Sequence, residues 1–198
     1  MSLRRLSALS LLCCLGACTT TPPVTPRHYL DEQTTATITV VADPISLIAI
    51  RPPDPGRWSR DQELQRKKDR NQDYLDFYGV DVNRMGSHRQ YIAMVKWVVP
   101  QQSADASPVV LLQMGSDTLE LRDPENDAKS LGMVQPLAVS FSGNSRWWYF
   151  PTDAATLKRI AAAPELGAQL TLGETQTPYK LARDGRAQLN EFTTVLPK

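Results

Sequence analysis

Short runs of alternating hydrophobic and polar residues recur along the chain, and the clearest pair predicts a β-hairpin. Residues 77–82 and 90–99 are rich in β-branched and aromatic side chains, and they flank a stretch, 83–87, that contains Asn and Gly. Asn and Gly tolerate the positive φ angles of tight turns. Alternate side chains of a strand point to opposite faces. One face of the second run, which we expect to be the core face, carries Tyr91, Ala93, Val95, Trp97 and Val99.

Similar runs predict strands on both sides of this hairpin. A period of two extends through 34–42, and a second apolar strand is expected at 45–50. Three further pairs of runs surround turn residues, namely 109–113 with 118–122, 137–141 with 146–150, and 178–182 with 187–194 around Asp184-Gly185. Asp-Gly between two such runs is a strong hairpin signal.

One short helix is expected to interrupt the strands. Thr152 or Asp153 can cap its first amides, Leu157 and Ile160 form a narrow apolar stripe, and Pro164 ends it. Short strands with polar turns and one short helix predict a mainly β fold. We expect a single antiparallel β-sandwich over residues 34–198, immunoglobulin-like in general architecture but without the hallmark residues of true immunoglobulin domains.

The N-terminus carries an export signal. Arg4 and Arg5 precede an apolar run that is far shorter than the ~20 residues of a membrane span. The run ends in Leu15-Gly16-Ala17-Cys18, which resembles the lipobox of bacterial lipoproteins. The resemblance implies that residues 1–17 are a signal peptide removed before Cys18, and that lipid on the Cys18 sulfur attaches the chain to a membrane. An ordinary secretory cleavage after Ala17, leaving a soluble periplasmic protein, is the alternative.

The residue after the cysteine bears on the location. In lipoproteins of Gram-negative bacteria, Asp at this position typically signals retention in the inner membrane, and here the position holds Thr19. For a Gram-negative host the resemblance therefore implies the periplasmic face of the outer membrane. Residues 18–33 are rich in Thr and Pro, which favours an extended tether between the lipid and the folded domain.

Composition excludes several classes of function. The formal net charge is +1, and removal of residues 1–17 would change it to about −1, which is not the basic excess expected of a nucleic-acid-binding protein. All three cysteines, Cys13, Cys14 and Cys18, lie in the signal or at its boundary. The mature domain would therefore have no thiol for a disulfide, a metal site or a nucleophile.

Catalytic groups are scarce. The chain has two histidines, and we expect His28 to lie in the tether and His88 to be a turn residue. The acidic stretch 123–127 lacks the spacing of a calcium loop and is expected to be a solvated turn. Asp76 and Asp81 flank Tyr78, but paired catalysis depends on a spatial separation that the sequence does not supply. We expect no catalytic residue, no metal and no cofactor.

The run Trp147-Trp148-Tyr149-Phe150 places aromatic side chains on both faces of an expected strand. One face should be core. The other must be covered by the 153–163 helix or the tether, or else contact a partner, because exposed aromatic patches often mark binding sites. The candidate binding surface consists of Arg146, Trp147, Trp148 and Tyr149.

These observations favour a non-catalytic binding or assembly component of the cell envelope. It would be anchored in the outer membrane, and its partner would be another envelope protein or a surface polymer. Two alternatives remain. A periplasmic hydrolase that uses carboxylates would need a cleft with acids of raised pKa, and a purely structural lipoprotein would make many weak contacts instead of one stoichiometric contact.

Overall fold

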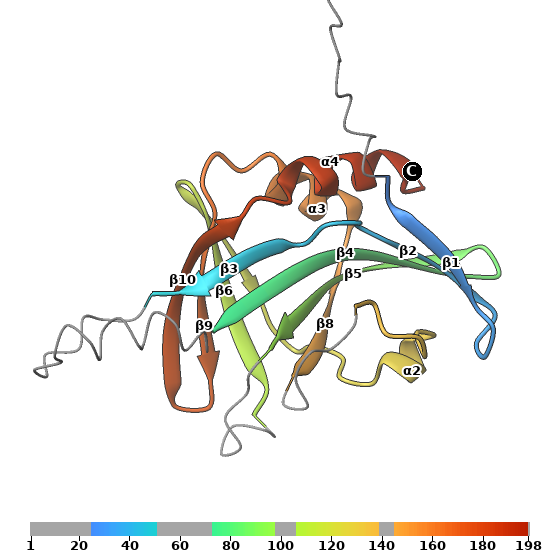
Figure 1. The fold of residues 1–198 in the computed structure, drawn as a ribbon, viewed down its shortest axis with the longest axis horizontal. Coiled ribbons are helices and arrows are strands. Elements are labelled where there is room, and N and C mark those ends of the chain that lie inside the picture. Colours follow the sequence, from blue (N-terminus) through green and yellow to red (C-terminus); the bar gives the residue numbers. More distant parts are fainter. Residues whose placement is uncertain (1–24, 51–72, 98–105, 139–144, 198) are drawn as a thin grey trace, which may run out of the picture.

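The computed structural model describes residues 25–50, 73–97, 106–138 and 145–197, which form a mainly β fold around one curled antiparallel sheet (Figure 1). The ten strands are β1 (Arg27–Asp31), β2 (Ala36–Val40), β3 (Ile45–Ala49), β4 (Tyr74–Arg84), β5 (Ser87–Lys96), β6 (Pro108–Met114), β7 (Asp117–Leu121), β8 (Arg146–Thr152), β9 (Gly167–Leu172) and β10 (Thr175–Arg183). The helices are α2 (Ala128–Leu131), α3 (Ala154–Ala161) and α4 (Arg186–Val195). The expected mainly β, antiparallel fold is confirmed, but the sandwich of two stacked sheets and the immunoglobulin-like arrangement are not, because the described strands form one sheet that curls into a half-barrel.

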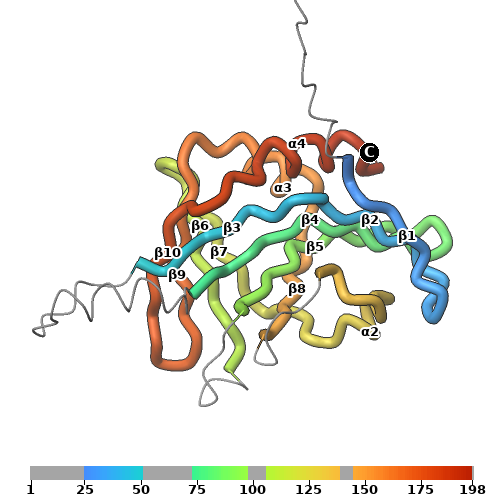
Figure 2. Tube along the Cα trace, viewed as in Figure 1, coloured from blue at the N-terminus to red at the C-terminus, as the bar shows by residue number. Residues whose placement is uncertain are grey.

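The long strand β4 organises the sheet. Along one edge it pairs with β5, and β5 pairs with β8. Along its other edge it pairs with two strands in succession, β3 near its start and β2 near its end. The sheet continues from β3 through β10, β9 and β6 to β7, while β1 pairs with β2. The tube trace in Figure 2 shows how the right-handed twist of the strands bends this sheet around an interior. Strands β1, β7 and β8 each pair with one described neighbour, so they form the open edges of the sheet.

The hairpin of β4 and β5 confirms the clearest sequence prediction. Its strands are joined by Met85 and Gly86, whose φ angles of 53° and 88° are both positive, as a type I′ turn requires. The sequence predicted one buried face for β5, but the structure buries both faces. Residues 91–96 are all buried, so both faces of β5 are covered. Val99 lies outside the described residues.

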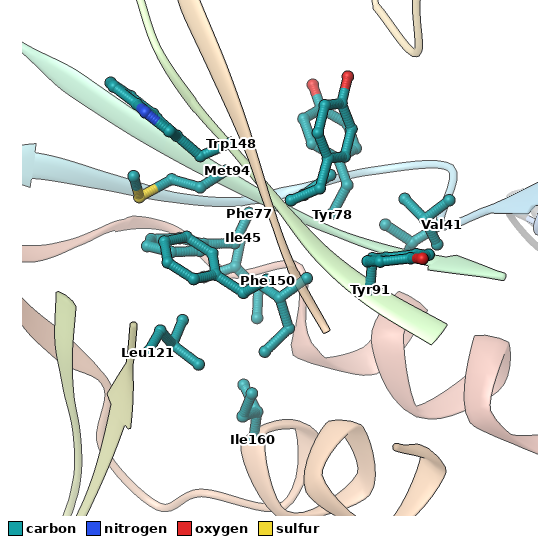
Figure 3. Close-up of a cluster of buried hydrophobic side chains, with 14 of the residues drawn as sticks. Val41, Ile45, Phe77, Tyr78, Tyr91, Met94, Leu121, Trp148, Phe150 and Ile160 are labelled. Carbon is teal, nitrogen blue, oxygen red and sulfur yellow. The ribbon is translucent and has the colours of Figure 1, made fainter. Parts of the chain in front are cut away.

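The inner face of the half-barrel holds the main core. Cross-strand partners share a face, so Phe77, Met94 and Trp148 line up side by side across three strands. Figure 3 shows Phe77, Ile45 and Phe150 gathered on the side of Ile160 from α3. The space left among these side chains is an apolar cavity of about 20 Å³, which has room for no more than about one water molecule. The described interior is therefore filled by the protein's own side chains.

One end of the inner face carries a buried charge. Lys96 is 4% exposed, forms an ion pair with Asp73 and donates a hydrogen bond of 2.9 Å to the Tyr179 hydroxyl. A buried ammonium is tolerated only when it is paired and hydrogen-bonded. Lys96 therefore joins the start of β4 and the end of β5 to the middle of β10 without exposing a charge to the apolar core.

The outer face of β4, β5 and β8 is covered by the segment 122–138, which includes α2. Backbone bonds between Glu125 and Tyr149 attach this segment to β8. At the other end, Arg27 donates to the Leu137 carbonyl at 2.8 Å. The central part of the sheet therefore separates two apolar layers, one inside the half-barrel and one beneath this segment.

The fully buried Asp31 holds that cover in place. Its Oδ1 accepts backbone N–H groups of Gln33 and Thr34 at 3.1 and 3.2 Å, and its Oδ2 accepts those of Val134 and Gln135 at 2.6 and 3.0 Å. Burial raises the pKa of Asp31, but these donors outweigh it and leave the pKa below its usual value. One carboxylate thus joins the β1–β2 turn to the segment that follows α2.

Helix α3 confirms the expected helix, and α4 corrects an expected strand. The Asp153 side chain caps α3 by accepting the Thr156 N–H at 2.6 Å, and Leu157 and Ile160 are buried as predicted. Residues 187–194 were expected to pair as a strand, but they belong to α4. The expected strand 137–141 is also not formed at 137 and 138, and its remaining residues lie outside the described residues.

The sheet begins earlier than the expected boundary at residue 34. Strand β1 lies within the expected tether 18–33, and its five residues pair with β2. The signal peptide 1–17 and Cys18 lie outside the described residues. Among the helices that the structure describes, none is both long and apolar enough to cross a membrane.

A methyl group at Gly79 is expected to loosen the contact between the sheet and α4. A Cβ atom there would lie 2.8 Å from Leu189 Cδ1 and 2.9 Å from Phe192 Cε1. We expect Gly79→Ala to lower the free energy of unfolding in urea by about 2 kcal/mol, the usual cost of overpacking a core. In a Leu189→Ala background the cost should shrink, because the methyl group gains room. The same cost in both backgrounds would contradict this explanation.

Candidate binding groove

Aromatic side chains form a ladder on the outer face of β4, β5 and β8. The Trp147 ring lies 5.6 Å from Tyr78, 6.3 Å from Trp97 and 6.3 Å from Tyr149, measured between ring centroids. The strand register explains these contacts, because the small Ala93 lies directly between Tyr78 and Tyr149. The rings can therefore approach one another above β5.

A groove of about 340 Å³ adjoins this ladder at Trp97. It is lined by Ser46, Tyr74, Asp76, Trp97, Ala182 and Arg183. The register brings three of these together, since Ser46 of β3 pairs with Asp76 of β4 on one side and with Arg183 of β10 on the other. Strands that are distant in the sequence thus form one concave surface.

The groove contains a carboxylate that is nearly withdrawn from water. Asp76 is 9% exposed, and its Oδ2 accepts a hydrogen bond of 2.6 Å from the Trp97 indole N–H. Arg183 does not neutralise it, because the guanidinium pairs with Asp43 at 2.8 Å. Among the residues that the structure describes, Asp76 has no cationic partner.

Tyr78 reports the electrostatics of this region. Burial raises the pKa of its hydroxyl to about 12, and the negative charge of Asp76 adds to the effect. The positive charges of Arg27 and Arg183 oppose it. The Tyr78 hydroxyl therefore stays protonated and can act as a neutral hydrogen-bond donor beside the groove.

The four residues of the expected binding surface do not form one surface. Trp148 is fully buried on the inner face, with its indole N–H unpaired, and Tyr149 is 5% exposed on the outer face. The Arg146 guanidinium lies 5.6 Å from the Trp148 ring, on the inner side of the sheet. Trp147 and Tyr149 both belong to the aromatic ladder, and the half-buried Trp147 is the one that contacts Trp97 at the groove. Trp148 and Tyr149 are therefore covered by the protein itself, and the use of the four residues as a binding surface stays a prediction.

Sequence reasoning missed the groove residues Asp76, Trp97 and Arg183. Trp97 was expected in the core, and Asp76 was considered only with Asp81. The two carboxylates lie on opposite faces of β4, since they are an odd number of residues apart. The available signal was the presence of acidic residues within a mostly apolar strand, and it does not distinguish Asp76 from Asp81.

Asp81 belongs to a second polar cluster, on the inner face. It is 3% exposed, and it contacts His88 Nδ1 at 2.8 Å and accepts a hydrogen bond of 2.9 Å from Gln90 Nε2. His88 is therefore a strand residue of β5 and not a turn residue. His28 lies in β1 with Nδ1 at 3.0 Å from the Thr39 hydroxyl, so its expected place in a tether is also corrected. Ser87 points to the face opposite His88, so the Asp81–His88 pair does not activate it.

A larger groove of about 590 Å³ lies at the seam between the open edges β7 and β8. Its charged side chains are already engaged, because Glu120 pairs with Arg122 and Asp153 caps α3. The backbone N–H and C=O of Tyr149 bond to the backbone of Glu125 on the side away from β5. Because backbone groups alternate along a strand, the residue two positions further on directs its backbone to the same side, toward this seam. Pro151 occupies such a position, where its missing N–H removes no ladder bond. The seam therefore presents few unsatisfied groups to a ligand.

Three described carboxyl groups have a pKa below the usual value. Backbone N–H donors hold the pKa of Asp153 low, and the Arg186 guanidinium does the same for Asp184. The pKa values of Asp31, Asp153 and Asp184 are all displaced downward, which is opposite to the raised pKa of a catalytic acid. No group of three or more His, Cys, Asp or Glu side chains within the described ranges is arranged to hold a metal ion.

Comparisons with family models, with curated proteins and with solved structures find no match for this chain.

Proposed function

We propose that this protein is a lipid-anchored component of the bacterial outer membrane that binds another envelope component through the groove beside Trp97, without catalysing a reaction. The partner is an envelope protein or a surface polymer. The resemblance of Leu15–Cys18 to a lipobox supports the location. The observation that carries the binding role is the nearly buried Asp76 carboxylate beside the aromatic ladder.

The arrangement of the groove supports binding more than reaction. Aromatic rings supply large apolar contact area, and a few fixed polar groups set the orientation of a ligand, as in typical binding sites. A hydrolase with two carboxylates would need Asp76 and Asp81 on the same side of the sheet, whereas they lie on opposite faces. The proposed role therefore uses Asp76 as a recognition group.

Photo-crosslinking in cells tests this function. A benzophenone amino acid at Ala182, an exposed residue of the groove, is expected to give one dominant adduct in the full chain. The same probe at Leu30, which is 57% exposed on β1, serves as the matched control and should not give that adduct. Cys18→Ser should abolish fatty-acid labelling and weaken the Ala182 adduct, because the protein leaves the membrane.

Three outcomes of this experiment would contradict the proposal. Equal sets of many weak adducts from both positions would instead indicate a structural lipoprotein. No adduct from Ala182 in the lipidated protein would mean that the groove does not face a partner. Unchanged fatty-acid labelling in Cys18→Ser would overturn the anchor.

A further inference from the structure

We infer that the groove receives a basic side chain, lysine or arginine, from a protein partner, which completes an ion pair with Asp76. This inference rests on the proposed function and narrows its partner to a protein with an exposed cationic residue.

The carboxylate of Asp76 is the group in the groove that would attract a cation. An ionised carboxylate that is nearly withdrawn from water is unfavourable unless it is paired and hydrogen-bonded. Its described donor, the Trp97 indole, is neutral and occupies one oxygen. A cation that enters the groove would therefore neutralise Asp76 at the position where the protein itself places no positive charge within the part of the chain that the structure describes.

The aromatic rings favour the same kind of ligand. The planes of Trp97 and Trp147 are inclined at 77° to each other, and Tyr78 lies against Trp147. The faces of aromatic rings carry negative electrostatic potential and attract cations within about 6 Å, most strongly for tryptophan. Inclined ring faces beside a carboxylate match a lysine ammonium or an arginine guanidinium.

Charge balance and size support one long side chain. Of the described charged groups in and beside the groove, Arg183 and Asp43 cancel each other, so Asp76 leaves a net negative charge. The volume of about 340 Å³ lies at the lower end of the range for ligand sites. A neutral sugar could hydrogen-bond to Asp76 and Ser46, but it would not neutralise the carboxylate.

A titration with blocked amino acids tests the inference in the full lipidated protein in detergent micelles. The probes are the N-acetyl methylamides of arginine, lysine and citrulline, where citrulline has nearly the shape of arginine and no charge. Tryptophan fluorescence reports binding near Trp97 and Trp147. We expect the arginine probe to bind at least about tenfold more tightly than the citrulline probe, and added salt to reduce the difference.

Matched variants assign the effect to Asp76. Asp76→Asn should bring the affinity for the arginine probe down to that for citrulline, while Asp117→Asn, at a carboxylate whose side chain is 69% exposed, should leave it unchanged. Urea unfolding of each variant checks that the fold is intact. Asp76→Glu, which keeps the charge, gives a second test and should retain part of the preference for arginine.

Three results would overturn the inference: equal affinity for the arginine and citrulline probes, an unchanged preference in Asp76→Asn, or fluorescence changes with a chitooligosaccharide that exceed those with arginine. The last would indicate a glycan groove. A dominant crosslink at Ala182 together with any of these results would leave the proposed function standing and reject the cationic ligand. Selective binding of the arginine probe without a crosslink at Ala182 would reject the proposed binding of an envelope partner, but it would support recognition of a cationic side chain by the groove.

Discussion

Replacing Gly185 with alanine is expected to lower the free energy of unfolding by about 3 kcal/mol. A Cβ atom on Gly185 would lie 2.6 Å from the Pro44 carbonyl carbon and 2.9 Å from the Asp43 carbonyl oxygen. Both are backbone atoms of the bend between β2 and β3, so they cannot rotate aside as a flexible side chain would. Overpacking against a fixed neighbour falls at the upper end of the usual cost. The start of α4 must then move away from the sheet.

Urea unfolding at neutral pH measures this cost, and Gly86→Ala separates space from backbone conformation. Gly185 has φ of −96°, which alanine adopts freely, so its cost should come from the clash alone. Gly86 is the reverse case, with φ of 88° and nothing within 4 Å of an added Cβ atom, and alanine there should cost about 1 kcal/mol. A smaller loss for Gly185→Ala than for Gly86→Ala would contradict the packing explanation.

Asp31→Asn is expected to destabilise the protein by about 3 kcal/mol at pH 7. An amide has one acceptor oxygen, so its NH₂ group would face two of the four backbone N–H groups that the carboxylate now accepts. Buried donors that lose their partner carry a large desolvation penalty, and bonds to a charged acceptor are stronger than neutral ones. We expect residues 132–137 of the covering segment 122–138 to detach from the β1–β2 turn.

The loss should depend on pH in a defined direction. The folded protein lowers the pKa of Asp31, so this group contributes stability above the pKa of the unfolded chain and loses it as the pH falls through the folded value. Wild type and Asp31→Asn should therefore differ fully at neutral pH and converge in acid. Asp117→Asn is the control and should stay within about 0.5 kcal/mol of wild type. A difference that is constant from neutral to acid pH would contradict the role assigned to the carboxylate.

Local signals predicted the local elements. The β4–β5 hairpin follows from a turn and two flanking runs that are contiguous in the sequence, and α3 follows from its cap and its apolar stripe. Helix α4 was mistaken for a strand because Asp184-Gly185 resembles a hairpin turn and Thr193, Thr194 and Val195 favour strands. The spacing of Leu189, Phe192 and Leu196 fits a helix, and burial of these side chains decides the conformation.

Pairing between strands that are far apart in the chain could not be predicted from local sequence patterns. Strand β9 was missed, and it is held by β6 and β10 through a register that no local pattern encodes. The groove has the same origin, because Ser46 and Arg183 become neighbours only when β10 pairs with β3. The Trp147–Phe150 run was correctly identified as two-faced, but only the tertiary structure shows that both faces are covered.

The open edges of the half-barrel have a consequence for how copies of this protein behave together. An exposed strand edge can pair with a second chain and begin aggregation. At the edge of β8, the backbone groups of Tyr149 already bond to Glu125, and Pro151 has no N–H to donate. At the edge of β7, a second strand would have to displace water from the Glu120–Arg122 ion pair, which is unfavourable. Extension of the sheet from chain to chain is therefore disfavoured at β7 and β8, whereas β1 keeps one edge that pairs with no described strand.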